Sequence, residues 1–189
     1  MTQLPFRPDH LDVRAFAQNA AQADGTLALS KLERLTEDLY GVEADLASQN
    51  VRWTARGRSL AVAGGVAQSW LHLEIAADLP LQCQRCLQGM SHPMALQRSF
   101  RFVRDEEEAN AQDDESEEDL LVASKQFDLL ALIEDELIMA LPFAPAHEVC
   151  PISVKLQASS LDYEAALNAK SKAFAALGEL KSVLKKDKT

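Results

Sequence analysis

The sequence predicts an α+β fold, in which an antiparallel β meander packs with a few helices and could curl toward a barrel. Apolar and polar residues alternate through much of residues 46–103, as in strands with one buried face. After Asp128, apolar residues recur at helical spacing until Pro142. A chain of 189 residues with 47% hydrophobic content can bury one core, so we expect one main domain with appendages.

These patterns divide the chain into three expected parts. Residues 1–45 form an N-terminal segment with a short helix. Residues 46–160 form a β-rich core domain that includes an acidic loop at 105–119 and a helix at 128–141. Residues 161–189 form a basic helical tail, with an apolar stripe of Phe174, Leu177, Leu180 and Leu184 beside lysines.

The short N-terminal helix is expected over residues 30–40. Ser30 can cap its first turn, and Glu33 completes a capping box. Apolar side chains at helical spacing would share one face of this helix: Leu32, Leu35 and Leu39.

The strands of the meander begin after residue 46. Alternation around Trp53 predicts a first strand, Arg56-Gly57-Arg58 predicts a hairpin turn, and Leu60 and Val62 begin the return strand. Gly64-Gly65 indicates a bulge or a second turn. Strands at residues 71–79 and 94–103 follow, which makes at least four antiparallel strands.

The net charge of −10 comes from one segment. Residues 105–119 contain ten carboxylates and no basic residue, so the rest of the chain is formally neutral. Because like charges this dense repel one another and bury nothing, we expect a mobile loop, serving either as a solvated spacer or as a partner contact. Residues 170–188 carry six lysines. The acidic segment and this basic segment would therefore attract partners of opposite charge.

Asp128 is a suitable N-cap for the helix that ends at Pro142. One of its sides is apolar, and consists of Leu129, Ile133, Leu137 and Ala140, with Leu132 and Met139 extending it. Glu136 projects between these apolar groups, which predicts burial against a sheet arginine, Arg52, Arg98 or Arg101.

Three successive carboxylates, Glu134, Asp135 and Glu136, lie on this helix. Successive helical residues point about 100° apart, so the three cannot converge on one metal or substrate. Glu134 and Asp135 are expected to be solvated unless they meet a partner. We therefore predict partner binding, and not catalysis, for this run.

A metal site is the strongest chemical signal. Cys83 and Cys86 have the C-x-x-C spacing of a metal-binding turn, and His147 and Cys150 supply an H-x-x-C pair. Together they would form a closed Cys3His site for structural zinc, with His92 as an alternative fourth ligand. The cysteines could instead be plain reduced thiols. Thioredoxin-like chemistry is disfavoured, since strands flank the C-x-x-C on both sides.

Other signals are weaker. Arg52, Arg56 and Arg58, with Trp53 and the C-terminal lysines, are the candidates for RNA contact. The sequence contains no Gly-rich phosphate loop, G-x-S-x-G or H-E-x-x-H motif, so we expect no enzyme and no small-molecule substrate. An odd cysteine count, no signal-peptide pattern and no long apolar run predict a cytoplasmic protein without membrane contact.

Several segments, in order, resemble the YceD family, also called the large ribosomal RNA subunit accumulation proteins. They are L-Q-C-Q-R-C-L-Q at 81–88, the acidic run, F-D-L-L-A-L-I-E-D-E-L-I-M-A-L-P at 127–142 and P-A-H-E-V-C at 145–150. The tail K-A-F-A-A-L-G-E-L-K is similar to the family's closing N-P-F-A-x-L-x-x-L-K, with Lys172-Ala173 in place of Asn-Pro.

This resemblance covers roughly residues 46–185. It implies a bacterial or plastid factor for the synthesis, processing or stability of 23S ribosomal RNA, with no catalytic activity assigned. A ribosomal protein or precursor large-subunit RNA is the expected partner. Two alternatives stay open. One is a metal-dependent RNA-processing enzyme that uses Glu136, His147 and the cysteines, and the other is a zinc-stapled adaptor unrelated to ribosomes.

Overall fold

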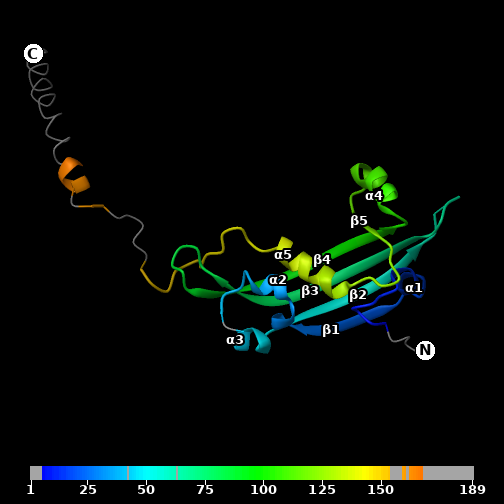
Figure 1. Ribbon diagram of the computed structural model, residues 1–189, viewed down its shortest axis with the longest axis horizontal. Helices are drawn as coiled ribbons and strands as arrows, with labels where there is room; N and C mark the ends of the chain where they lie inside the picture. The colour runs from blue at the N-terminus through cyan, green and yellow to red at the C-terminus, as the bar shows by residue number, and fades with distance from the viewer. Residues whose placement is uncertain (1–5, 42, 63, 154–158, 161, 168–189) are drawn as a thin grey trace, which may run out of the picture. The chain divides into compact units, whose positions relative to one another are not determined.

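The computed structural model describes residues 6–41, 43–62, 64–153, 159–160 and 162–167 (Figure 1). Contacts divide the chain into two units, Met1–Cys150 and Pro151–Thr189. The first unit contains one five-stranded mixed sheet, in the order β1-β2-β3-β4-β5. This confirms the predicted α+β class. The sheet is open and does not close into a barrel, because β1 and β5 are its two edges.

Four strands form the antiparallel meander: β1 (Gln22–Ala28), β2 (Asn50–Leu60), β3 (Gln68–Gln82) and β4 (Gly89–Val103). A short fifth strand, β5 (Asp119–Val122), runs parallel to β4, with Asp119 opposite Phe100. The strongest predicted strand is confirmed in β3, where every second side chain from Leu71 to Leu81 is buried. That period of two gives the sheet one apolar face.

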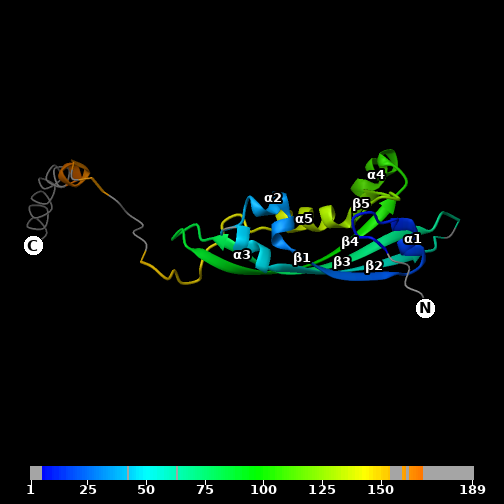
Figure 2. The same ribbon diagram turned by 60° about the horizontal axis from the view of Figure 1, so that its bottom comes forward.

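Helices pack on this apolar face. Figure 2 shows α1 (Val13–Gln18), α2 (Glu33–Thr36) and α5 (Leu129–Met139) on the same side of the sheet. A further helix, α3 (Glu43–Ser48), precedes β2. Side chains from β2, β3, β4, α1 and α5 join one core that includes Phe16, Val51, Leu73, Phe100 and Ile133. The opposite face carries mostly polar side chains, such as Arg52, His72 and Glu74, between the buried positions.

The first predicted hairpin turn is wrong. Strand β2 continues through Arg56-Gly57-Arg58, and the turn to β3 lies beyond Leu60, where Gly64 has a φ of +74°. Gly57 serves close packing instead, because a Cβ placed there would lie 2.6 Å from the backbone oxygen of Phe16 in α1. The expected turn at Gly64-Gly65 is confirmed, with the Gly65 N–H donating to Val62 O at 3.2 Å.

The helix expected over residues 30–40 is shorter and begins differently. A 3-10 turn, η1 (Leu29–Lys31), precedes α2, whose N-cap is Leu32 and receives no side-chain hydrogen bond. The predicted Ser30–Glu33 capping box therefore does not form. Of the predicted apolar face, Leu32 and Leu35 are buried, while Leu39 lies beyond the end of α2 and is only partly buried against the core.

The acidic segment is folded and is not a featureless loop. It contains α4 (Glu106–Gln112) and a 3-10 turn, η2 (Asp113–Glu115), and leads into β5. Asp105 caps α4 by accepting from the Glu108 N–H at 2.9 Å, and this bond, with Arg104, holds the pKa of Asp105 below its ordinary value. Local caps thus offset the repulsion that predicted a loop.

A single buried arginine anchors this segment to the sheet. Arg101 on β4 is 7% exposed and donates to Glu118 at 2.6 Å, to Gln112 at 2.8 Å and to Ser116 at 2.7 Å. The sequence named Arg101 only as a candidate partner for Glu136. The contacts show that it is the cation around which the acidic segment folds.

Helix α5 confirms its prediction closely. Asp128 accepts hydrogen bonds from the N–H groups of Leu130 and Ala131, and Leu129, Ile133 and Leu137 are buried. Met139 does not extend the buried face, since it is 81% exposed.

Most of the predicted basic tail lies outside the described residues, including its whole apolar stripe. Residues 162–167 are helical. No helix in the described part of the chain is long and apolar enough to cross a membrane.

Candidate metal centre

The first half of the candidate centre lies in the turn between β3 and β4. This turn spans residues 83–88 and is closed by two backbone hydrogen bonds, Cys83 N–H to Gln88 O at 2.9 Å and Leu87 N–H to Cys83 O at 2.8 Å. Leu87 has a φ of 60°, a conformation that tight turns require and that side chains other than glycine seldom adopt. Both Cys83 and Cys86 are buried there.

The second half comes from the segment that follows α5. Pro142 prevents the helix from continuing, and residues 140–150 run to the β3–β4 turn. Two hydrogen bonds to backbone oxygens help to join the segments: the Gln84 N–H donates to Pro145 O at 2.8 Å, and the Arg85 guanidinium donates to Glu148 O at 3.4 Å. These contacts bring His147 and Cys150 to the cysteine turn.

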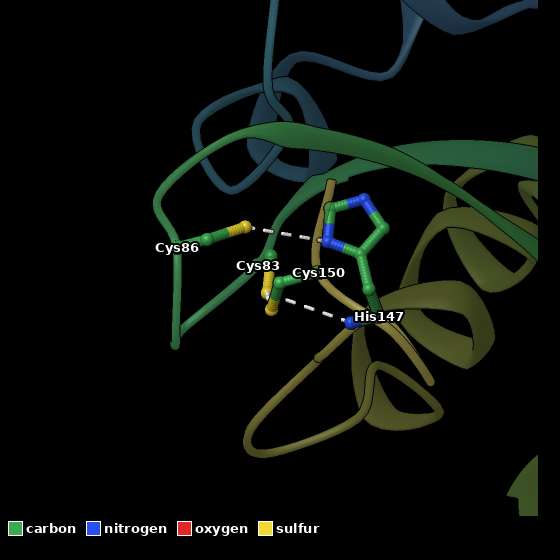
Figure 3. A group of neighbouring side chains, drawn as sticks. All are labelled: Cys83, Cys86, His147 and Cys150. Carbon is green, nitrogen blue, oxygen red and sulfur yellow. Dashed lines mark hydrogen bonds between the residues drawn. The ribbon is translucent and has the colours of Figure 1, made fainter. Parts of the chain in front are cut away.

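The four side chains converge on one point (Figure 3). Their ligand atoms all lie within 4.8 Å of one another. Cys83 Sγ and Cys150 Sγ are 4.0 Å apart, and Cys86 Sγ and His147 Nδ1 are 3.4 Å apart. The predicted Cys3His group is therefore present. His92 stands on β4 opposite Leu79 and is not one of the converging residues.

The surroundings of Cys83 favour its thiolate. Burial opposes ionisation, but the backbone N–H groups of His147, Cys86 and Arg85 point at the sulfur and lower the pKa of Cys83 to about 5. The His147 N–H is 3.5 Å from it. Burial and the neighbouring thiols of Cys86 and Cys83 raise the pKa of Cys150 to about 11. One thiolate is thus stabilised in advance, and a cation would favour ionisation of the others.

The donor set fits zinc. With Zn–S bonds of about 2.3 Å, two sulfurs at the corners of a tetrahedron lie about 3.8 Å apart. The separation of 4.0 Å between Cys83 Sγ and Cys150 Sγ is close to that value. Three sulfurs and one imidazole fill all four positions of a structural zinc site and leave none for a substrate or a reactive water.

The three successive carboxylates of α5 have separate partners. Glu134 is buried and accepts hydrogen bonds from the backbone N–H groups of Arg34 and Leu35, and from the Arg34 guanidinium at 2.9 Å. Asp135 is exposed and pairs with the same guanidinium at 2.6 Å. Glu136 pairs with Arg98 at 2.8 Å, one of the arginines named for it. Solvation of Glu134, expected from sequence, is wrong.

The three candidate arginines of β2 lie on the sheet face opposite the core. Arg52, Arg56 and Arg58 are exposed and alternate with buried residues. Arg56 pairs with Glu74 on β3 at 2.8 Å. Trp53 does not accompany them, since it faces the core and is 7% exposed. An aromatic that does share the arginines' face is Trp70, the strand partner of Arg58.

Comparison with known proteins identifies the relatives of this chain. A family model described as large ribosomal RNA subunit accumulation protein YceD matches residues 71–181. The chain belongs to the YceD family. A curated relative, the large ribosomal RNA subunit accumulation protein YceD of Haemophilus influenzae, is 29% identical over 167 residues, covering 87% of this chain and 90% of the relative. No solved structure matches.

The part of the chain that matches the YceD model includes all four candidate metal ligands and α5, but not β1, β2 or Arg34. Arg34 was not recognised from the sequence, although it connects α2 to α5. Its only sequence signal is a lone basic residue on a short helix, which is an ordinary surface pattern. The C-x-x-C and H-x-x-C spacings, by contrast, were sufficient to identify their residues.

Proposed function

We propose that this protein is a non-enzymatic factor for the accumulation of 23S ribosomal RNA, which it supports by binding a ribosomal protein or precursor large-subunit RNA. The main support for this function is the match of residues 71–181 to the YceD family model. The name of the Haemophilus influenzae relative points to the same process. Direct binding of a component of the large subunit is the simplest way for a chain of this size to affect that RNA.

The geometry supports binding over catalysis. A four-ligand Cys3His site has no free coordination position, so an ion held there would not activate water. Glu136, the carboxylate in the alternative enzymatic interpretation, is already paired with Arg98. We therefore assign a structural role to the candidate metal centre. An ion there would hold the segment after α5 against the β3–β4 turn.

The metal assignment has a direct test. Purified full-length protein should contain one zinc per chain by elemental analysis, and Cys83→Ser with Cys86→Ser should remove it. Leu87→Ala is a suitable control, because it alters the same turn without removing a ligand. Protein purified without zinc that also fails to bind added zinc or cobalt would contradict the assignment.

Precursor RNA is one of the two proposed partners, and one surface of the sheet is suited to binding it. Arg52, Arg56 and Arg58 project from a sheet face on which the described residues place no helix. Arginines next to a partly exposed aromatic can contact phosphates while a base stacks. Ultraviolet crosslinking to precursor RNA should weaken in an R52A/R56A/R58A variant if this face is used.

The function itself is tested in a strain lacking the gene. The ratio of 23S to 16S ribosomal RNA, and the large-subunit peak in sedimentation, should fall and should recover when the wild-type gene is returned. A normal ratio would instead favour an adaptor unrelated to ribosomes. Cleavage of precursor RNA by the purified protein, lost on Glu136→Gln, would support the enzymatic alternative.

A further inference from the structure

A groove of about 780 Å³ lies along β4, between α5 and the residues that lead into β5. In Figure 1, α5 and β5 both lie alongside β4. The acidic segment forms one wall of this groove and α5 forms the other. Residues far apart in sequence are therefore brought to one surface.

The floor of the groove combines apolar side chains with Gln97 and Ser99 of β4. It contains Phe100 and Leu132, which are 2% and 9% exposed, and the half-buried Leu121. Met139, at the end of α5, is 81% exposed and lines the same groove. A flexible, polarisable side chain in this position is well suited to packing against an apolar group of a partner.

The rim of the groove is strongly acidic. Arg98 is the one basic residue that lines the groove, whereas five lining residues are carboxylates: Glu117, Glu118, Asp119, Asp135 and Glu136. Arg98 is paired with Glu136, and Glu118 is paired with the buried Arg101. Glu117 and Asp119 are exposed and form no ion pair with the described residues. Asp135 is paired with Arg34, so the uncompensated negative charge of the groove comes from Glu117 and Asp119.

The open edge of β4 favours an extended ligand. Strand β5 pairs only with Phe100 to Val103, and β4 begins eleven residues earlier, at Gly89. In the described part of the chain, residues 89–99 have no strand partner on that side. Pro93 lies in this stretch, as is usual for an edge strand. Backbone groups along such an edge can pair with an added strand.

From these features we propose that the groove binds an extended, lysine- or arginine-rich segment of a basic protein, which places at least one apolar side chain on Met139. The proposal rests on the proposed function and specifies the class of its partner. Charge complementarity decides the class, because the acidic rim attracts a cationic peptide and repels the phosphates of RNA. The apolar side chains of the floor add specificity that an acidic surface alone would lack.

The test measures binding of labelled probes to the full-length protein at low salt by fluorescence anisotropy. The probes are a peptide of alternating lysine and leucine, an oligolysine of equal charge, and single-stranded oligouridylate. We expect the alternating peptide to bind most tightly. E117Q/D119N should weaken its binding about tenfold, since two exposed ion pairs are lost. Met139→Ala should weaken the alternating peptide and leave oligolysine unchanged.

The matched control is D113N/D114N, which removes the same charge from the same acidic segment at exposed residues outside the groove. It should change peptide binding less than twofold. Equal losses in both double variants would overturn the proposal in favour of unspecific attraction, and preferred binding of oligouridylate would overturn it in favour of RNA. Neither result bears on the RNA ratio in the deletion strain, so the groove and the function can fail separately.

Discussion

Three neighbouring carboxylates on α5 show how strongly a side chain's role depends on distant residues. Glu134 accepts from two backbone N–H groups of α2 and from the guanidinium of Arg34, a residue 100 positions away. Asp135 meets the same arginine in solvent, and Glu136 meets Arg98. One carboxylate therefore satisfies otherwise unpaired N–H groups at the start of a helix, while its neighbour makes only a surface ion pair.

This difference predicts unequal effects of substitution. Glu134→Gln should destabilise the protein by about 1–2 kcal/mol, because a largely buried charge-assisted hydrogen-bond network loses its charge. Asp135→Asn, at 52% side-chain exposure, should cost less than about 0.5 kcal/mol. Urea unfolding followed by circular dichroism measures both. Equal effects would mean that burial and the backbone N–H groups of α2 add no stability at Glu134.

At this scale the sequence was informative where a residue's role followed from local spacing. Helical geometry correctly turned Glu136 toward the sheet, and one of its three candidate arginines is its partner. Burial of Glu134 could not be predicted, because it depends on a contact with α2 that no spacing within α5 encodes. The actual partners of Arg101 could not be predicted either, since they lie in a segment that repulsion between like charges predicted to be unfolded.

Among the elements, the long ones were predictable and the short ones were not. Strand β3 and helix α5 have sustained periods of two and of 3.6, so their existence and buried faces followed from sequence. Helix α1 and strand β1 have only six and seven residues, and were missed. The sequence predicted two strands in place of β2, because Arg56-Gly57-Arg58 resembles a turn. In the structure Gly57 lies within the strand and allows α1 to pack closely against it.

The packing of α1 on β2 can be tested at that glycine. Gly57→Ala should destabilise the protein by about 1–3 kcal/mol, because the added methyl would lie 2.6 Å from Phe16 O and 2.7 Å from the Phe16 ring. Gly65→Ala is the matched control, since its nearest neighbour would be 3.5 Å away, and it should be close to neutral. Thermal unfolding compares the two. A neutral Gly57→Ala would show that α1 can move away without cost.

For the molecule as a whole, the candidate metal centre joins two distant parts of one unit. The β3–β4 turn supplies two ligands and the segment after α5 supplies the other two. The spacing of the cysteines and of His147 allowed this set to be predicted, because metal ligands commonly occur as two close pairs. Sequence alone could not establish that the pairs meet, which depends on the length and direction of α5.

Chelation should therefore destabilise the protein. Zinc-loaded protein treated with a strong chelator should unfold at a temperature lower by about 10 °C, as expected when about 3–4 kcal/mol is lost from a domain of this size. Differential scanning calorimetry measures the shift, and adding zinc back should reverse it. The Cys83→Ser, Cys86→Ser variant should show no response to chelator. An unchanged unfolding temperature in the wild-type protein would count against a structural ion.

Cys83 and Cys150 stand 67 positions apart, and the stretch between them contains β4, the acidic segment and α5. An ion bound to both would convert this stretch into a closed ring. Closing a loop of that length removes roughly 4 kcal/mol of chain entropy from the unfolded state, by analogy with a disulfide. If α5 detached locally, the metal link at Cys150 would keep it close to its own sheet. Helix α5 would then return to the sheet before the corresponding helix of another chain could bind there.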